Sequence, residues 1–250
     1  MCFQLTRETA PPELPTKDDN QNIHCLLKEY AYVFQEPSRL PPAREVDHCI
    51  TLKEGTEPIN VHPYRYAHFQ KTKIEKQVQE MLDSGLIRPS TSPFSSPMLL
   101  VMKKDDSWWF CTDYRSLNVA TIKDRFPIPI VDDMLEELYS VAYFTKFDLR
   151  AGYHQVRVNP SDVNKIAFRT HNDHYKYLVM PFGLCNAPST FQVIMNSIFW
   201  PYLRKFILVF FDDILVYIPT WNEHLLHVRQ TLETLWQHQF FAKTSKCVFG

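Results

Sequence analysis

The chain has 250 residues, of which 45% are hydrophobic and 14% aromatic, so it is long enough to bury a sizeable core and has the composition of a folded protein. Its formal charge of -1 lacks the basic excess usual in phosphate-binding proteins, although a local basic face would be hidden in that sum. The six cysteines form no CxxC pair and no uncharged apolar run approaches ~20 residues, so a zinc ribbon, a disulfide framework and a membrane span are not expected, and an intracellular location fits best.

The N-terminal half contains mainly helix and hairpin signals. After a Pro-rich, polar leader over residues 1–44, the predicted elements are a short helix over 22–34 inside that leader, a helix over 67–85, strands over about 97–103 and 108–114, and a short helix within 125–140. In the helix over 67–85, Ile74 and Val78 recur on one face, and Gly85 is its expected end.

The C-terminal half alternates strand and helix patterns. The predicted elements are a strand that ends near Asp148, a strand pair at 165–170 and 174–180, a helix over 187–203, strands at 206–211 and 214–217, and a helix over 220–239. Thr220 and Glu223 have the spacing of a capping box at the start of the last helix. This order of elements predicts an α+β fold with helices packed on one face of an antiparallel sheet.

Two adjacent carboxylates, Asp212 and Asp213, interrupt the apolar run "ILVFFDDILVY" between two expected strands. Burying an ionised carboxylate without a partner costs several kcal/mol or more, so a partner is needed if the pair is buried. Aspartate is also a common turn residue, so a solvated turn is the alternative.

Asp148 ends a third apolar strand, in "YFTKFDLRAGY". If that strand lies beside the hairpin, three carboxylates converge, and their repulsion has to be neutralised by cations. Oxygen ligands with no histidine nearby in the sequence favour Mg²⁺ over zinc or copper. Two such ions are the arrangement for in-line nucleotidyl transfer.

A set of longer motifs carries a family resemblance. From about residue 45 to the end, in order, the chain contains "PINVHPYRY", "SGLIRPSTSPFSSPMLLVMKK", "FCTDYRSLN", "TIKDRFPIPIVDDMLEEL", "FTKFDLRAGYHQVRV", "KIAFRT", "YLVMPFGLCNAPSTFQ", "FILVFFDDILVY" and "EHLLHV". In these motifs it resembles the reverse transcriptase (RNA-directed DNA polymerase) of Ty3/gypsy-class LTR retrotransposon polyproteins. The resemblance implies a right-hand polymerase with fingers at about 60–140 and in part of 150–185, and an incomplete palm at about 141–250. The thumb, RNase H, integrase and protease regions are expected outside this chain.

The resemblance also implies roles for individual residues. Asp148, Asp212 and Asp213 match the catalytic carboxylates that hold two Mg²⁺ ions, with Mn²⁺ as an alternative ion. The implied nucleotide-binding residues are Lys103, Leu149, Tyr153 and Phe182, and the implied template or primer contacts are Arg115 and Pro188. The tyrosine matches an aromatic ring that clashes with a 2'-hydroxyl and so selects deoxynucleotides.

Each assignment has a structural alternative. Tyr153 and Phe182 are core rings by default, Lys103 could be the solvated end of a hairpin, and Arg115 could simply pair with Asp113. The histidines lack a metal-site signature and are expected at the surface: His171, His174, His224 and His227.

Three positions depart from the family pattern. Trp109 stands where the family has an arginine that grips the triphosphate, and an indole offers no charge for that contact. Asp106 and Asp173 stand where the family usually has glycine. An inactive fragment that retains the fold and weak nucleic-acid binding is therefore the alternative to a polymerase.

The resemblance implies partners as well. They are an RNA or DNA template with a primer, and deoxynucleoside triphosphates, in cytoplasmic particles. A metal nuclease could use the same carboxylates, but "YLVMPFG" and "RAGYHQ" would have no role in one.

Overall fold

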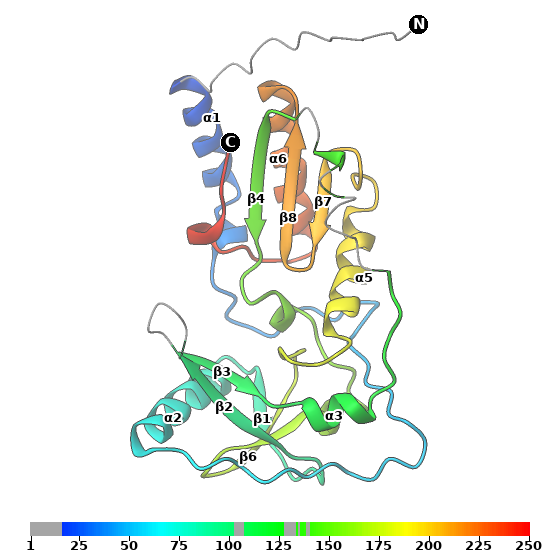
Figure 1. Cartoon of the computed structure of the whole chain (residues 1–250). Helices are drawn as coiled ribbons and strands as arrows, with labels where there is room; N and C mark the ends of the chain where they lie inside the picture. Colours follow the sequence, from blue (N-terminus) through cyan, green and yellow to red (C-terminus); the bar gives the residue numbers. More distant parts are fainter. Residues whose placement is uncertain (1–16, 103–107, 128–133, 135, 139–140) are drawn as a thin grey trace, which may run out of the picture.

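A computed structural model describes residues 17–102, 108–127, 134, 136–138 and 141–250. Two sheets lie one above the other in Figure 1, and the chain passes between them more than once. The helices are α1 (Lys17–Glu29), α2 (His68–Asp83), α3 (Arg115–Ala120), α5 (Ala187–Phe199) and α6 (Trp221–Gln237), with short 3-10 turns η1 (Ala31–Phe34), η2 (Gly152–Gln155), η3 (Val163–Ile166) and η4 (Thr244–Lys246). The strands are β1 (Ile87–Pro89), β2 (Ser96–Met102), β3 (Trp108–Thr112), β4 (Tyr143–Asp148), β5 (Ala167–Arg169), β6 (His174–Tyr177), β7 (Ile207–Phe210) and β8 (Asp213–Ile218).

The upper sheet has the strand order β4-β8-β7 and is antiparallel throughout. Alternate residues of β4 are buried, with Thr145 and Phe147 inside, because successive side chains of a strand point to opposite faces. Helix α6 covers this sheet along β4 and β8, and α5 packs beside β7. The other face of β4 therefore carries Lys146 and Asp148.

The lower sheet has the order β1-β6-β5-β2-β3. Its β2–β5 pair is parallel, whereas the upper sheet, which carries the Asp-Asp hairpin, is antiparallel as predicted. The reason is the path of the chain, which leaves β3, builds β4 in the upper sheet, and then returns to add β5 and β6. Helix α2 packs near β1 and buries Ile74 and Val78, as its periodicity predicts.

The N-terminal segment differs from its prediction. In place of one helix over 22–34, α1 ends at Glu29 and a separate turn, η1, buries Val33. Both elements lie against α6, so part of the leader is packed, with Ile23, Leu26 and Val33 buried. The predicted pattern merged two elements because Leu26 and Val33 are both buried in the main core.

Helix α6 begins where the capping spacing predicts, with Thr220 at the N-cap position. The capping box itself does not form, because the Thr220 hydroxyl donates to the Glu223 carboxylate at 2.6 Å and no side chain caps the backbone. Helix α3 and strand β1 were not predicted. Both are short and carry little periodic pattern.

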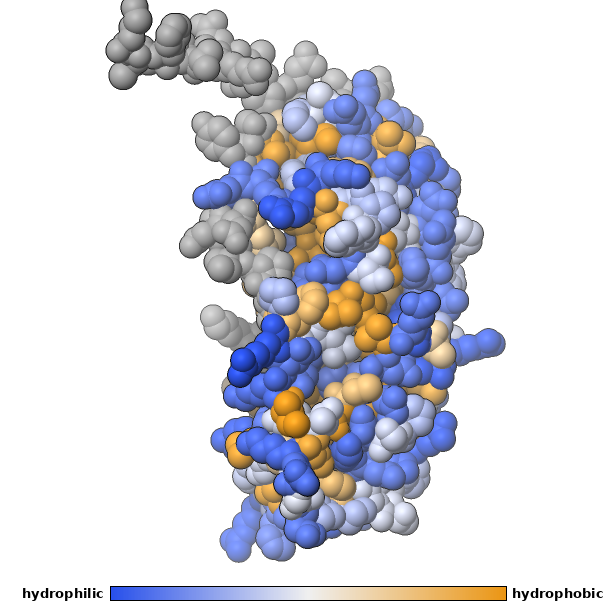
Figure 2. Space-filling view, turned by 90° about the vertical axis from the view of Figure 1, so that its right-hand side faces the viewer, coloured by the Kyte–Doolittle hydropathy of each residue, from blue (hydrophilic) through white to orange (hydrophobic). Residues whose placement is uncertain are grey.

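The C-terminal segment returns along the free edge of β4. Ala242 bridges Leu149, Val248 bridges Lys146, and the Lys243 amide donates to the Asp148 carbonyl at 2.9 Å. Most of the buried apolar side chains form one continuous cluster that includes residues of both sheets. On the side that carries α5, apolar side chains gather in patches bordered by hydrophilic residues (Figure 2), and Trp200 just after α5 is 76% exposed. None of the described helices is long and apolar enough to cross a membrane.

Candidate active site

The Asp-Asp hairpin turns through Phe211 and Asp212 alone, because Phe210 pairs with Asp213 across the two strands. Phe211 has φ 56°, in the left-handed region. Two-residue hairpin loops favour positive φ because it matches the twist of the strands, but a bulky residue pays a steric penalty there. The turn therefore needs support from its surroundings.

Gln192 of α5 supplies that support. Its side-chain oxygen accepts from the Phe211 amide at 3.2 Å, and its amide nitrogen donates to the Val209 carbonyl at 3.1 Å and to Asn196 at 2.9 Å. Gln192 is fully buried, so these bonds do not compete with water. Sequence reasoning missed this residue, since nothing in the helical pattern of α5 distinguishes it.

The three predicted carboxylates come to one end of the upper sheet. Asp148 lies directly opposite Asp213 in the β4–β8 register, and the Leu149 amide donates to the Asp212 carbonyl at 3.0 Å. Strand β4 thus lies beside the hairpin, which is the condition under which the three carboxylates were predicted to converge.

Two lysines neutralise part of this negative charge. Lys146 Nζ lies 2.8 Å from Asp213 Oδ2, and Lys246 Nζ lies 3.3 Å from Asp148 Oδ2. Burial raises the pKa of Asp212, and the neighbouring Asp213 and Asp148 raise it further. The position of Lys146, two residues before Asp148 on the same strand face, is a sequence signal that could have identified it.

The donor set fits a divalent cation in its chemistry. All the donors are carboxylate oxygens, which suit Mg²⁺ or Mn²⁺, and burial together with the neighbouring carboxylates raises the pKa of Asp212, so a bound cation would favour its ionised form. Among the residues that the structure describes, however, no three acidic, His or Cys side chains are close enough together to form a complete metal cage. Asp148 and Asp213 each contact a lysine through Oδ2, so a bound cation would compete with these lysines for the carboxylates.

Tyr153 and Phe182 stand together beside the carboxylates. Their ring centroids are 4.9 Å apart, and Tyr153 also lies 5.4 Å from the buried ring of Phe191. Burial, followed by the charge of Asp212, raises the pKa of Tyr153 to about 12. Both rings are half-buried.

Gly152 is the point of closest approach between η2 and the hairpin. A Cβ added to it would lie 3.0 Å from Asp212 Cβ and 3.2 Å from Phe191 Cζ. Any larger residue would push against the Asp-Asp turn, so this position requires glycine.

The remaining predicted residues have mixed positions. Leu149 is 1% exposed, so only its backbone is available to a nucleotide. Arg115 is exposed and ion-paired with Asp113 at 2.6 Å, and it also donates to the Tyr64 hydroxyl at 3.2 Å. Pro188 lies in the first turn of α5 and is half-buried.

Two of the predicted residues lie outside the part of the chain that the structure describes, and a third is described only through its backbone. Lys103 and Asp106 lie outside the described residues. Trp109 pairs with Val101 through the backbone of β3. Asp173 does not adopt positive φ, which explains how a position that favours glycine in the family accepts an aspartate.

The surface expectation is wrong for one histidine. His224 is fully buried and bonds to Thr145 Oγ1 at 2.8 Å through its Nε2 atom. Burial lowers its pKa to about 4, so it is neutral. His171 bonds to Glu75 at 3.0 Å, and His227 stacks on Phe206 with centroids 3.7 Å apart.

Comparison with known proteins gives one family. The family described as "Reverse transcriptase (RNA-dependent DNA polymerase)" matches residues 101–250. The "Retrovirus-related Pol polyprotein from transposon 297" of Drosophila melanogaster is 39% identical over 93% of this chain and 22% of its own length. The "Transposon Tf2-3 polyprotein" of Schizosaccharomyces pombe is 28% identical over 95% of this chain and 17% of its own length. The chain therefore spans about a fifth of these relatives.

Solved structures agree in fold. The native prototype foamy virus protease-reverse transcriptase superposes with a TM-score of 0.80 at 21% identity, covering 94% of this chain and 31% of that one. A foamy viral protease-reverse transcriptase in complex with an RNA/DNA hybrid gives a TM-score of 0.81 at 19% identity, with 94% and 31% covered. These similarities support the right-hand polymerase fold that the motifs imply.

Proposed function

The chain belongs to the reverse transcriptase (RNA-dependent DNA polymerase) family, and on that premise we propose that it extends a primer by template-directed deoxynucleotidyl transfer in the replication of a Ty3/gypsy-class retrotransposon. The 3'-hydroxyl oxygen of the primer attacks the α-phosphorus of a deoxynucleoside triphosphate. The bond to the bridging oxygen breaks, and pyrophosphate leaves.

The observation that carries this proposal is the register of β4 and β8, which sets Asp148 opposite Asp213 with Asp212 in the adjoining turn. Asp148 and Asp212 would hold Mg²⁺, with Asp213 beside them. When bound, the two ions lower the pKa of the attacking hydroxyl and stabilise the leaving oxygen.

The chain's own residues orient the reactants. The Tyr153 and Phe182 rings would form the floor and side of the nucleotide site, where a 2'-hydroxyl would meet the tyrosine ring. The Gln192 contacts fix the backbone of the turn, which keeps Asp212 in one position. Such fixed geometry contributes to the rate because the site does not have to reorganise during the reaction.

The partners follow from the same premise. They would be an RNA or DNA template with its primer, with Arg115 and Pro188 near those strands, and deoxynucleoside triphosphates. Because the curated relatives are polyproteins of which this chain spans about a fifth, RNase H, integrase and protease regions would accompany it in the intact element. The cytoplasmic particles of such elements would be its location.

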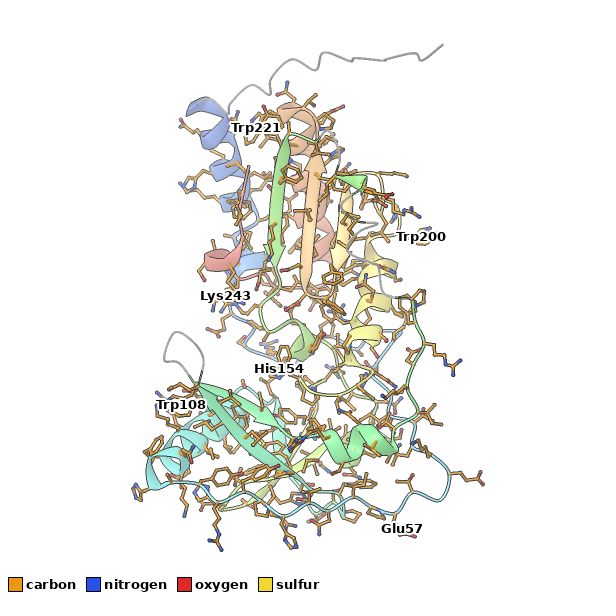
Figure 3. All side chains as sticks on the ribbon, in the orientation of Figure 1. Glu57, Trp108, His154, Trp200, Trp221 and Lys243 are labelled. Carbon is orange, nitrogen blue, oxygen red and sulfur yellow. The ribbon has the colours of Figure 1, made fainter. Side chains whose placement is uncertain are left out.

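Primer extension on an RNA template with Mg²⁺ tests the proposal. We expect extension by the unmodified chain and its loss in Asp212→Asn. Glu57→Gln is the matched control, because it removes a carboxylate at the far end of the molecule (Figure 3). Equal extension by Asp212→Asn would refute the proposed role of the hairpin.

A second candidate is an inactive chain that keeps the fold and binds nucleic acid weakly. The observation that favours it is Trp109 at the position of a triphosphate-binding arginine. Extension by Trp109→Arg but not by the unmodified chain would support this candidate. Salt-dependent affinity for a primer–template duplex, without extension, would support it as well.

A further inference from the structure

Arg150 emerges on the same side of the chain as Asp148. The segment 148–150 pairs with 241–243, since the Lys243 amide donates to the Asp148 carbonyl and the Arg150 amide donates to the Phe241 carbonyl, both at 2.9 Å. In an extended pair, alternate side chains share a face. Leu149, between them, is buried, so Asp148 and Arg150 share the opposite face, with side chains 14% and 26% exposed.

A cavity of about 660 Å³ opens beside Arg150, near the labelled His154 in Figure 3. Its walls come from the N-terminal segment at 35–42, the end of α2, the 150–155 segment and residues 239–241. The cavity is large enough for a polyphosphate with part of a nucleoside.

The guanidinium of Arg150 has unused hydrogen-bonding capacity in this wall. Its Nε is buried without a partner, and Nη1 lies 3.7 Å from Glu36 Oε1, beyond hydrogen-bonding distance. Glu36 is 83% exposed, so its hold on Arg150 is weak. Arginine binds phosphate in a two-pronged geometry that an exposed carboxylate at this distance does not match.

The other charged groups of the cavity do not replace this contact. Glu80 lies 3.9 Å from Lys76. His154 is neutral, because burial lowers its pKa to about 4. Arg39, also in the wall, makes no ion pair with any residue that the structure describes, so it adds to the positive potential.

We propose that Arg150 binds the β- and γ-phosphates of the incoming nucleotide, and that Glu36 of the N-terminal segment occupies this anion site until the nucleotide displaces it. The inference rests on the proposed function. It supplies from the palm the cation that Trp109 cannot supply from β3, and it gives the segment before the polymerase motifs a part in nucleotide binding.

The test has two readouts. Calorimetric titration with inorganic tripolyphosphate measures the anion site without catalysis, and primer extension measures KM for the nucleotide. We expect Arg150→Met to weaken tripolyphosphate binding and to raise KM by roughly tenfold or more, as for loss of a charge-assisted contact. Arg150→Lys should recover part of the loss, and Glu36→Gln should tighten binding by roughly threefold.

Matched controls come from a second exposed ion pair. Arg229 and Glu29 are 2.6 Å apart and neither lines the cavity, so Arg229→Met and Glu29→Gln should change neither readout. Thermal unfolding identifies any variant that fails to fold.

The outcomes distinguish failure of the anion site from failure of the proposed function. Tripolyphosphate that does not bind the unmodified chain, or an Arg150→Met variant with unchanged affinity and KM, overturns the proposal. Weaker binding in Glu36→Gln overturns the displacement step. Extension with an unchanged KM in Arg150→Met refutes this inference alone, whereas Arg150-dependent tripolyphosphate binding without any extension supports the anion site and counts against the proposed function.

Discussion

Replacing Gly152 by alanine would press directly on the turn that carries Asp212. The new Cβ would lie 3.0 Å from Asp212 Cβ, whereas carbon atoms in contact normally stand about 3.5–4.0 Å apart. One of the two must therefore move by about 0.5–1 Å. Asp212 Cβ is fixed to the backbone, so no rotamer change relieves the contact, and Phe191 at 3.2 Å closes the other direction.

This displacement has separate effects on activity and stability. A misplacement of about 1 Å at a reacting group can cost roughly 100-fold in rate, so we expect kcat of Gly152→Ala to fall by one to two orders of magnitude. Overpacking costs about 1–3 kcal/mol, which for a chain of this size lowers Tm by roughly 2–12 °C. Steady-state primer extension and thermal unfolding measure the two effects.

Gly85→Ala is the control for destabilisation alone. Gly85 has φ 72° with no atom within 4 Å of an added Cβ, so alanine there costs about 1–2 kcal/mol of backbone strain without touching the site. Its kcat should be unchanged. Normal kcat in Gly152→Ala would refute the reasoning, because it would show that the turn moves without loss of function.

Three further predictions concern hydrogen bonding and charge. Gln192→Leu leaves the Phe211 amide and the Val209 carbonyl without their side-chain partner. We therefore expect urea denaturation to give a free energy of unfolding about 1–3 kcal/mol lower, and we expect a lower kcat. An unchanged free energy of unfolding would show that the Gln192 side-chain amide is dispensable. Burial raises the pKa of Asp212, so its ionised form destabilises the fold as pH rises. Without divalent ions, Asp212→Asn should therefore have a higher Tm than the unmodified chain at about pH 7, and this difference should disappear toward about pH 4. Adding Mg²⁺ should raise the Tm of the unmodified chain more than that of Asp212→Asn. Equal Tm shifts in the two proteins would contradict a metal site at Asp212. Burial lowers the pKa of His224 from 6.5 to about 4, so its contribution to stability is full above pH 6.5 and is lost as pH falls toward 4; His224→Gln should flatten this loss in denaturation curves, and an unchanged slope would show that other groups cause it.

The elements around the three aspartates could be predicted because their signals are local. The apolar runs on either side of Asp212 fix β7 and β8, and the alternation before Asp148 fixes β4. Their pairing followed from one further assumption, that both strands belong to the same sheet. The β4–β8 register confirms that assumption.

The remaining features depend on contacts between distant segments. Gln192 is a polar residue in an amphipathic helix, and only the position of Phe211 against it gives it a role. Lys246 meets Asp148 because the C-terminal segment returns along β4, which no local pattern encodes. The Glu36–Arg150 contact likewise joins segments that share no motif.

The parallel pairing of β2 with β5 has a consequence for how the chain folds. Ser96 pairs with Phe168, and β4 lies between them in the sequence, so the lower sheet cannot close until the chain has passed through the upper one. Closing such a long loop carries an entropic cost that local contacts do not repay, which slows folding and couples the two sheets into one cooperative unit. A fragment that stopped before β5 would present the edge of β2 unpaired, with exposed Val101 and Met102 beside it, and would tend to aggregate. The two sheets are therefore expected to form and to unfold together.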